Sequence, residues 1–122
     1  KYEPSPLVGD VAANDYVLMR YSDALLMKAE AILRGGSGTA PDMTVYNTRT
    51  GVTADISTLP KLYAERGREL WWEGWRRNDM IRFGTFLNVR GLKPYTSSSK
   101  YLLYPIPADA LFNSNLSQNP GY

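Results

Sequence analysis

The sequence predicts an all-α fold in which a few helices are joined by long irregular loops. Residues 18–33 carry apolar side chains at steps of three and four, and residues 59–75 carry glutamates at steps of four. Both spacings place the repeated side chains on one face of a helix. The segments between are rich in glycine, proline, serine and threonine, which is typical of loops.

The composition is that of one globular domain, or of a piece of a larger one. The 122 residues are 43% hydrophobic and 21% charged, which argues against disorder. The formal net charge is only +2, so nucleic acid is not the expected partner. Cysteine and histidine are absent, which excludes disulfides, histidine-based triads and thiolate or imidazole metal sites, and we expect no metal and no cofactor. No run approaches the ~20 apolar residues of a membrane span.

The N-terminal part is predicted to be an extended segment followed by a helix. Residues 1–13 contain two prolines and a glycine, and Asn14 or Asp15 is the expected N-cap of the helix. One apolar side consists of Leu18, Tyr21, Leu25, Ala29 and Ile32, and the opposite side of Ala24, Met27 and Ala31. Because a helix that is apolar on two sides is normally enclosed, we expect neighbours on both. Gly35-Gly36 should end the helix by supplying a positive φ.

A short helix is predicted over residues 43–50. Asp42 is its expected cap and Gly51 its expected end. Val45 and the threonines are β-branched, so a strand is the alternative for this segment.

The following helix is predicted to run from about Leu59 to about Trp75. Thr58 is the expected N-cap, and Pro60 falls in the first turn, where its missing N–H does no harm. A second, shorter helical piece is expected over residues 78–87.

The C-terminal part is predicted to be mostly irregular. Residues 88–100 form a loop by composition, and Pro105-Ile106-Pro107 forces extended backbone. Residues 108–112 are expected to form one helical turn.

Charged residues concentrate in the segment Glu65 to Gly84. Its glutamates are four residues apart, so they share one helix face, and ion pairs are expected. Four of its arginines lie three or four residues from at least one glutamate, namely Arg66, Arg68, Arg76 and Arg77. Asp79 lies three residues from Arg76 and three from Arg82, which continues the alternation. We assign to this predicted structural network Glu65, Arg66, Glu69, Glu73, Arg76, Asp79 and Arg82.

The same segment holds all three tryptophans, Trp71, Trp72 and Trp75. Aromatic residues at helical spacing usually cover a core, and we favour that interpretation. The alternative is a platform on which sugar rings stack, which makes the three tryptophans speculative ligand-binding residues.

Paired carboxylates also raise the possibility of a glycoside hydrolase that uses Glu69 and Glu73. A general acid needs a raised pKa, whereas neighbouring arginines lower the pKa of a carboxyl group. We therefore predict no catalytic residue and no enzyme activity.

Four segments resemble motifs of the SusD/RagB family, in the same order as in that family. They are LMRYSDALLMKAEAILRGG (Leu18 to Gly36), VYNTRTGV (Val45 to Val52), ERGRELWWEGWRRNDMIRFG (Glu65 to Gly84) and YPIPADALFNSNLSQNPGY (Tyr104 to Tyr122). The resemblance covers most of the chain and places it in the C-terminal region of such a protein.

The resemblance implies a tetratricopeptide-like helical packing in a longer, surface-exposed lipoprotein of the outer membrane of Bacteroidetes. It further implies a SusC-like TonB-dependent transporter as partner and a glycan as ligand, with the lipid anchor upstream of Lys1. The expected function is non-catalytic capture of oligosaccharide for that transporter. The alternative is a purely structural or interaction module, with the glycan or peptide cargo bound by the missing N-terminal part.

Overall fold

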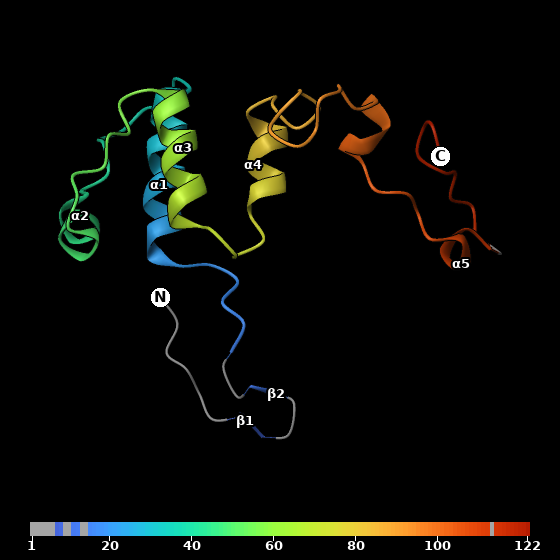
Figure 1. The fold of residues 1–122 in the computed structure, drawn as a ribbon, viewed down its shortest axis with the longest axis horizontal. Helices are drawn as coiled ribbons and strands as arrows, with labels where there is room; N and C mark the ends of the chain where they lie inside the picture. Colours follow the sequence, from blue (N-terminus) through green and yellow to red (C-terminus); the bar gives the residue numbers. More distant parts are fainter. Residues whose placement is uncertain (1–6, 9–10, 13–14, 113) are drawn as a thin grey trace. The chain divides into compact units, whose positions relative to one another are not determined.

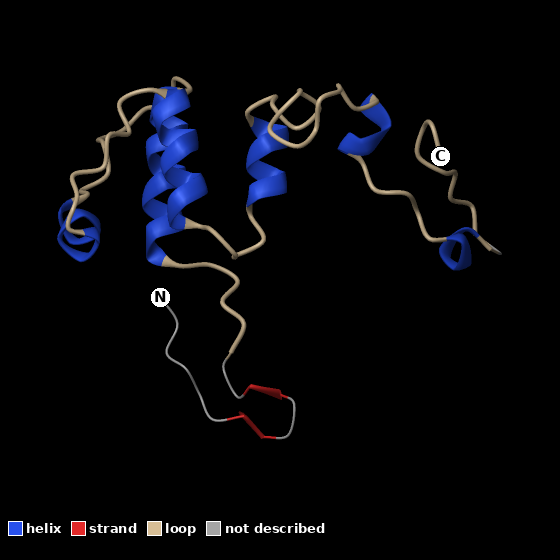
Figure 2. Cartoon of the chain, in the orientation of Figure 1, coloured by secondary structure: helices blue, strands red, loops and turns tan. Residues whose placement is uncertain are grey.

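The computed structural model of the chain describes residues 7–8, 11–12, 15–112 and 114–122. Its helices are α1 (Tyr21–Leu33), α2 (Thr44–Thr50), α3 (Leu59–Glu69), α4 (Arg76–Arg82), the 3-10 helix η1 (Ser99–Leu102) and α5 (Ala108–Leu111) (Figures 1 and 2). The predicted helical class is confirmed, and the tetratricopeptide-like packing stays a prediction. The chain forms two compact units, Lys1–Gly74 and Trp75–Tyr122.

The extended lead-in lies partly outside the described residues, as does Asn14. Two short strands are described there, β1 (Leu7–Val8) and β2 (Val11–Ala12), which pair antiparallel with Leu7 opposite Ala12.

Helix α1 begins later than predicted, and Asp15 does not cap it. The N-cap is Arg20, whose backbone is extended and whose side chain makes no capping hydrogen bond. That side chain is instead bound by carboxylates at the end of α3, as described below. At the other end, Gly35 has φ +94° and the Gly36 N–H donates to the Ala31 carbonyl oxygen at 2.8 Å, so the predicted glycine ending is confirmed.

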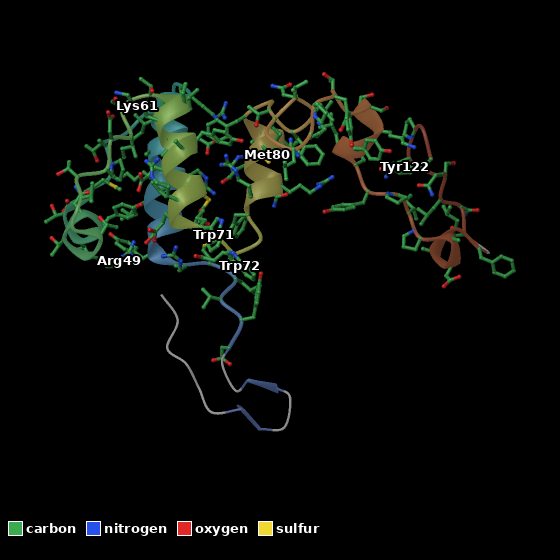
Figure 3. The ribbon with its side chains drawn as sticks, viewed as in Figure 1. Arg49, Lys61, Trp71, Trp72, Met80 and Tyr122 are labelled. Carbon is green, nitrogen blue, oxygen red and sulfur yellow. The ribbon has the colours of Figure 1, made fainter. Side chains whose placement is uncertain are left out.

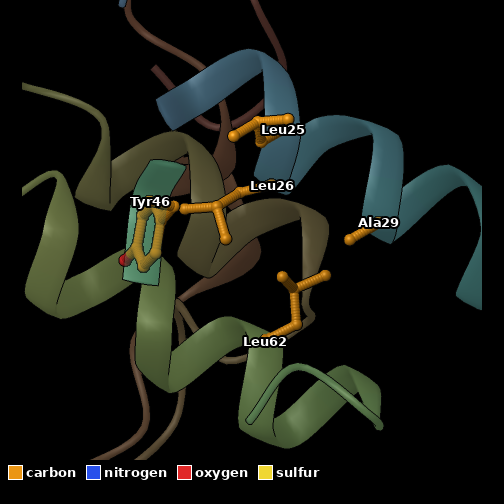
Figure 4. Packing of buried hydrophobic residues seen from close by; sticks show 5 residues of the cluster. All are labelled: Leu25, Leu26, Ala29, Tyr46 and Leu62. Carbon is orange, nitrogen blue, oxygen red and sulfur yellow. The ribbon is translucent and has the colours of Figure 1, made fainter. Parts of the chain in front are cut away.

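The core of the first unit lies between α1 and α3, which run in opposite directions in Figure 1. It consists of Leu25, Leu26 and Ala29 from α1, Tyr46 from α2 and Leu62 from α3 (Figure 4). Only one side of α1 is covered in this way. Ala24 and Ala31, on the other side, are exposed, so the prediction of neighbours on both sides is wrong for the described residues.

Helix α2 is a helix and not a strand. Its N-cap is Met43 and not the predicted Asp42, although the Asp42 carboxylate accepts a hydrogen bond from the Thr44 N–H at 2.9 Å. Gly51 closes the helix with φ +70°, as predicted. Helix α3 begins as predicted, with the Thr58 hydroxyl oxygen accepting from the Lys61 N–H at 3.4 Å and Pro60 in the first turn.

Helix α3 ends at Glu69, and the predicted continuation to Trp75 is wrong. A further turn would need the Glu69 carbonyl oxygen to accept from the Glu73 N–H. The guanidinium of Arg20 occupies that oxygen at 2.7 Å, and the Glu73 N–H donates to Leu70 instead. Trp72 and Gly74 then adopt left-handed backbone, with φ +69° and +78°, which a helix cannot contain.

In the second unit, α4 covers residues 76–82 and not the predicted 78–87. Gly84 has φ +70°, and the N–H groups of Thr85 and Phe86 both donate to the Met80 carbonyl oxygen, which ends the helix. The predicted helical turn near residue 108 is confirmed as α5.

Candidate functional site

Arg20 holds the end of α3 through two glutamates that are far away in the sequence. Its Nε and Nη2 donate to the two carboxylate oxygens of Glu73 at 2.7 and 2.9 Å, a bidentate arrangement. Its Nη1 donates to Glu69 Oε1 at 2.6 Å. Burial disfavours the charged guanidinium, but the hydrogen bonds to Glu73 and Glu69 outweigh this effect and raise the pKa of Arg20. We call Arg20, Glu69 and Glu73 the arginine clamp.

Glu69 also accepts a hydrogen bond from a second arginine, Arg49 of α2, at 2.6 Å. Burial alone would raise the pKa of Glu69. Hydrogen bonds from Arg49, Arg20 and Ser22 outweigh burial, and the pKa lies below its ordinary value. A carboxylate held in its ionised form is unsuited to donate a proton to a leaving group, which disfavours the glycoside hydrolase interpretation.

A second ion pair joins α1 and α3 one helical turn away from the arginine clamp. Arg66 Nη1 lies 2.8 Å from Asp23 Oδ1. Both side chains are only 1% exposed, so this ion pair is fully buried. Next to it, the Tyr46 hydroxyl donates to Glu65, which also pairs with Arg68. Burial, then the hydrogen bond to Glu65, raises the pKa of the Tyr46 hydroxyl.

The residues assigned to the ion-pair network are thus placed in two ways. Glu65–Arg68 and Asp79–Arg82 are local pairs three residues apart, of which the second has a distance of 2.9 Å. Glu69, Glu73 and Arg66 instead pair with residues more than 40 positions away, or 20 in the case of Glu69 and Arg49. Arg76 is the exposed first residue of α4.

The turn after α3 presents two tryptophans to solvent. Leu70 and Glu73 point inward and are 3% and 5% exposed, whereas Trp71 and Trp72 between them are 67% and 82% exposed. The two indole rings lie edge to face, with centroids 5.4 Å apart and an interplanar angle of 63° (Figure 3). Among the described residues, Trp71 and Trp72 therefore cover no core, in contrast to the favoured interpretation. Trp75 belongs to the second unit, where it is the half-buried N-cap of α4.

A cleft in the second unit was not predicted from the sequence. It has a volume of about 470 Å³ and is lined by tyrosines and basic residues, most of them from residues 90–104. The sequence does indicate such a site through the high density of tyrosine and basic residues in that segment. The same segment is rich in turn-forming residues, so its composition predicts a loop.

Other kinds of site are not seen in the part of the chain that is described. No helix among these residues is long and apolar enough to cross a membrane. Within the same ranges, no three acidic residues are grouped so as to hold a metal ion.

Comparison with known proteins assigns the chain to a family. The profile of the SusD family matches residues 1–122. The starch-binding protein SusD of Bacteroides thetaiotaomicron is 36% identical over an alignment 119 residues long, which covers 88% of this chain. The chain spans 22% of the length of that relative. On these grounds, and in agreement with the motifs in its sequence, the chain belongs to the SusD family.

Proposed function

We propose that this chain is part of a non-catalytic glycan-binding protein that captures oligosaccharide for uptake across the outer membrane. Family membership and the similarity to a starch-binding protein support a binding role rather than hydrolysis. The lowered pKa of Glu69 supports the same conclusion, because hydrogen bonds from Arg49 and Arg20 keep this carboxylate ionised and unsuited to act as a general acid.

The observation that carries the proposal is the exposed pair Trp71 and Trp72. Sugar rings have apolar faces that stack on indole, and two rings at 63° offer two such surfaces of different orientation. The pair is held on a rigid support, since the residues on either side of it, Leu70 and Glu73, are buried and Glu73 is bound by the arginine clamp. Rigid presentation limits the entropy that is lost when a ligand binds.

The proposal includes the partners and the location of the whole protein. A SusC-like TonB-dependent transporter would receive the oligosaccharide, and the protein would be a surface lipoprotein of the outer membrane, anchored by a lipid outside these 122 residues. Family membership supports both points.

Titration with malto-oligosaccharides and with a panel of other neutral glycans tests the binding role. We expect Trp72→Ala to weaken the affinity by roughly tenfold or more, as loss of a tryptophan anchor commonly does. Phe112→Ala, at a residue that is 79% exposed, is the matched control and should leave the affinity unchanged. Equal affinity of Trp72→Ala and wild type would remove the tryptophan pair from the site.

A second candidate is a structural or interaction module that touches no glycan. It is favoured by a group of exposed apolar residues that lead into α1, namely Tyr16, Leu18, Met19 and Tyr21, which are 60–75% exposed. Apolar residues gathered on a surface commonly mark a contact with another protein or domain. Glycan binding by the complete natural protein, but not by these 122 residues, would favour this candidate and place the ligand site elsewhere.

A further inference from the structure

The cleft of the second unit combines positive charge with aromatic rings. Arg77, Arg90 and Lys93 line it together with tyrosines that include Tyr95 and Tyr104. Its volume of about 470 Å³ lies within the usual range for small-ligand sites, which is roughly 300–1,000 Å³.

Two of the cations are held side by side by the backbone. Arg90 and Lys93 form an antiparallel bridge in which each N–H donates to the other residue's carbonyl oxygen, at 2.9 and 2.6 Å. Residues that face each other in such a bridge have neighbouring side chains, and like charges in this position repel. Desolvation and the nearby charge of Arg90 lower the pKa of Lys93, as expected for two crowded cations. The fold therefore maintains a repulsion that a bound anion would relieve.

No carboxylate among the described residues neutralises these charges. Arg77 donates to the Tyr101 carbonyl oxygen at 2.8 Å and lies 4.0 Å from the centre of the Tyr104 ring. Arg90 and Lys93 donate to backbone carbonyl oxygens at 2.7–3.0 Å. Arginines of the first unit are paired differently, because Arg20, Arg49 and Arg66 all bind carboxylates.

The rest of the lining suits a sugar. Tyr95, Tyr104 and Tyr122 add aromatic rings, although Arg77 covers one face of Tyr104 and the Tyr122 hydroxyl donates to the Leu103 carbonyl oxygen. Ser97 and Ser98 add hydroxyls (Tyr122 is labelled in Figure 3). Rings stack on the apolar faces of a sugar, and hydroxyls exchange hydrogen bonds with its hydroxyls. A neutral glycan would use these groups but would leave the three cations without a counter-charge.

We propose that this cleft binds an acidic oligosaccharide, with a uronate carboxylate or a sulfate ester placed between Arg77, Arg90 and Lys93. The inference rests on the proposed glycan-binding role and adds to it a second site, separate from the tryptophan pair, with its own class of glycan. Hydrogen bonds between such cations and an anion are charge-assisted and stronger than those between neutral groups.

Titration of the full chain with a tetragalacturonate and with a neutral tetrasaccharide, maltotetraose, tests the proposal. The variant Arg90→Gln with Lys93→Gln removes two charges and leaves Arg77 in place. We expect roughly tenfold weaker binding of tetragalacturonate for each charge removed, and no change for maltotetraose. Raising the salt concentration should weaken only the acidic ligand.

Two further variants separate charge from folding. Lys28→Gln with Arg34→Gln removes the same charge from α1 and its C-cap, and should leave tetragalacturonate binding unchanged. Arg90→Lys with Lys93→Arg keeps the charges while changing the side chains, and should retain most of the affinity even if the Gln variant is unstable.

The outcomes distinguish this inference from the proposed function. Equal affinity for both tetrasaccharides, unaffected by the Arg90 and Lys93 substitutions, would overturn the acidic ligand and leave glycan binding intact. Binding of an acidic peptide such as tetraglutamate in place of tetragalacturonate would overturn the inference as well. Absence of binding to any glycan, including those of the neutral panel, would refute the proposed function itself.

Discussion

Arg66 of α3 and Asp23 of α1 form an ion pair that is buried on both sides, with Nη1 2.8 Å from Oδ1. It lies between the arginine clamp and the apolar contact of Leu26 with Leu62, so that polar and apolar layers follow one another along two antiparallel helices. Such a pair contributes less to stability than its Coulomb energy suggests, because both charges lose their hydration. Its main effect is to penalise any packing of the two helices that separates the charges.

Removal of one partner of this pair should be strongly destabilising. Asp23→Ala takes one carboxylate away from the buried Arg66 guanidinium, and we expect the free energy of unfolding to fall by about 3–5 kcal/mol. Urea denaturation of the two proteins measures the difference.

Replacement of both partners provides the control. The double variant Asp23→Leu with Arg66→Met removes both buried charges, and it should be more stable than Asp23→Ala. If the double variant is the less stable of the two, the pair stabilises the fold in its own right and the desolvation argument fails.

Leu62 should be the most sensitive position of the apolar core. Its side chain is fully buried where α3 packs against α1, so Leu62→Ala leaves a cavity and is expected to cost about 2–5 kcal/mol of unfolding free energy. Val52→Ala, at a residue that is 67% exposed, should change stability by less than about 0.5 kcal/mol. Similar losses in the two variants would show that the contact of α1 with α3 is not the stabilising core.

Glu69 should make stability depend on pH. Its pKa in the folded state lies below the ordinary glutamate value of 4.5, so its contribution is complete above pH 4.5. As the pH falls below 4.5, the unfolded chain takes up the proton first and this contribution is lost. The gap in unfolding free energy between wild type and Glu69→Gln should therefore shrink as the pH is lowered from 7 to 3. A gap that stays constant over this range would contradict the lowered pKa.

The helix boundaries show which features of this fold are local. Thr58 and Pro60 begin α3 through a hydrogen bond and a backbone angle set within four residues, and Gly51 ends α2 in the same way. Signals of this kind are readable in a sequence. The start of α1 and the end of α3 cannot be predicted from local sequence in this way. Both depend on hydrogen bonds from Arg20 to Glu69 and Glu73, which lie 49 and 53 residues away.

The candidate site illustrates the same limit. Glutamates four residues apart predicted ion pairs along one helix, but α3 ends at Glu69. Glu69 and Glu73 are instead bound by Arg20, which is distant in the sequence. The exposure of Trp71 and Trp72 follows from that early end. The cleft around Arg90 and Lys93 depends on a tight bridge inside a segment whose composition indicates only a loop.

The backbone of Trp72 allows its ring to be tested apart from its conformation. Its φ of +69° is unfavourable for any residue other than glycine, at a cost of about 1–2 kcal/mol. Trp72→Gly and Trp72→Ala both remove the exposed ring, but only glycine relieves the strain. We expect Trp72→Gly to be the more stable variant by about 1 kcal/mol in thermal or urea denaturation. Both variants should lose glycan affinity to the same extent, because the ring is absent from each. If affinity instead followed stability, so that the glycine variant bound as well as wild type, the tryptophan would act by shaping the turn and not by contacting the sugar.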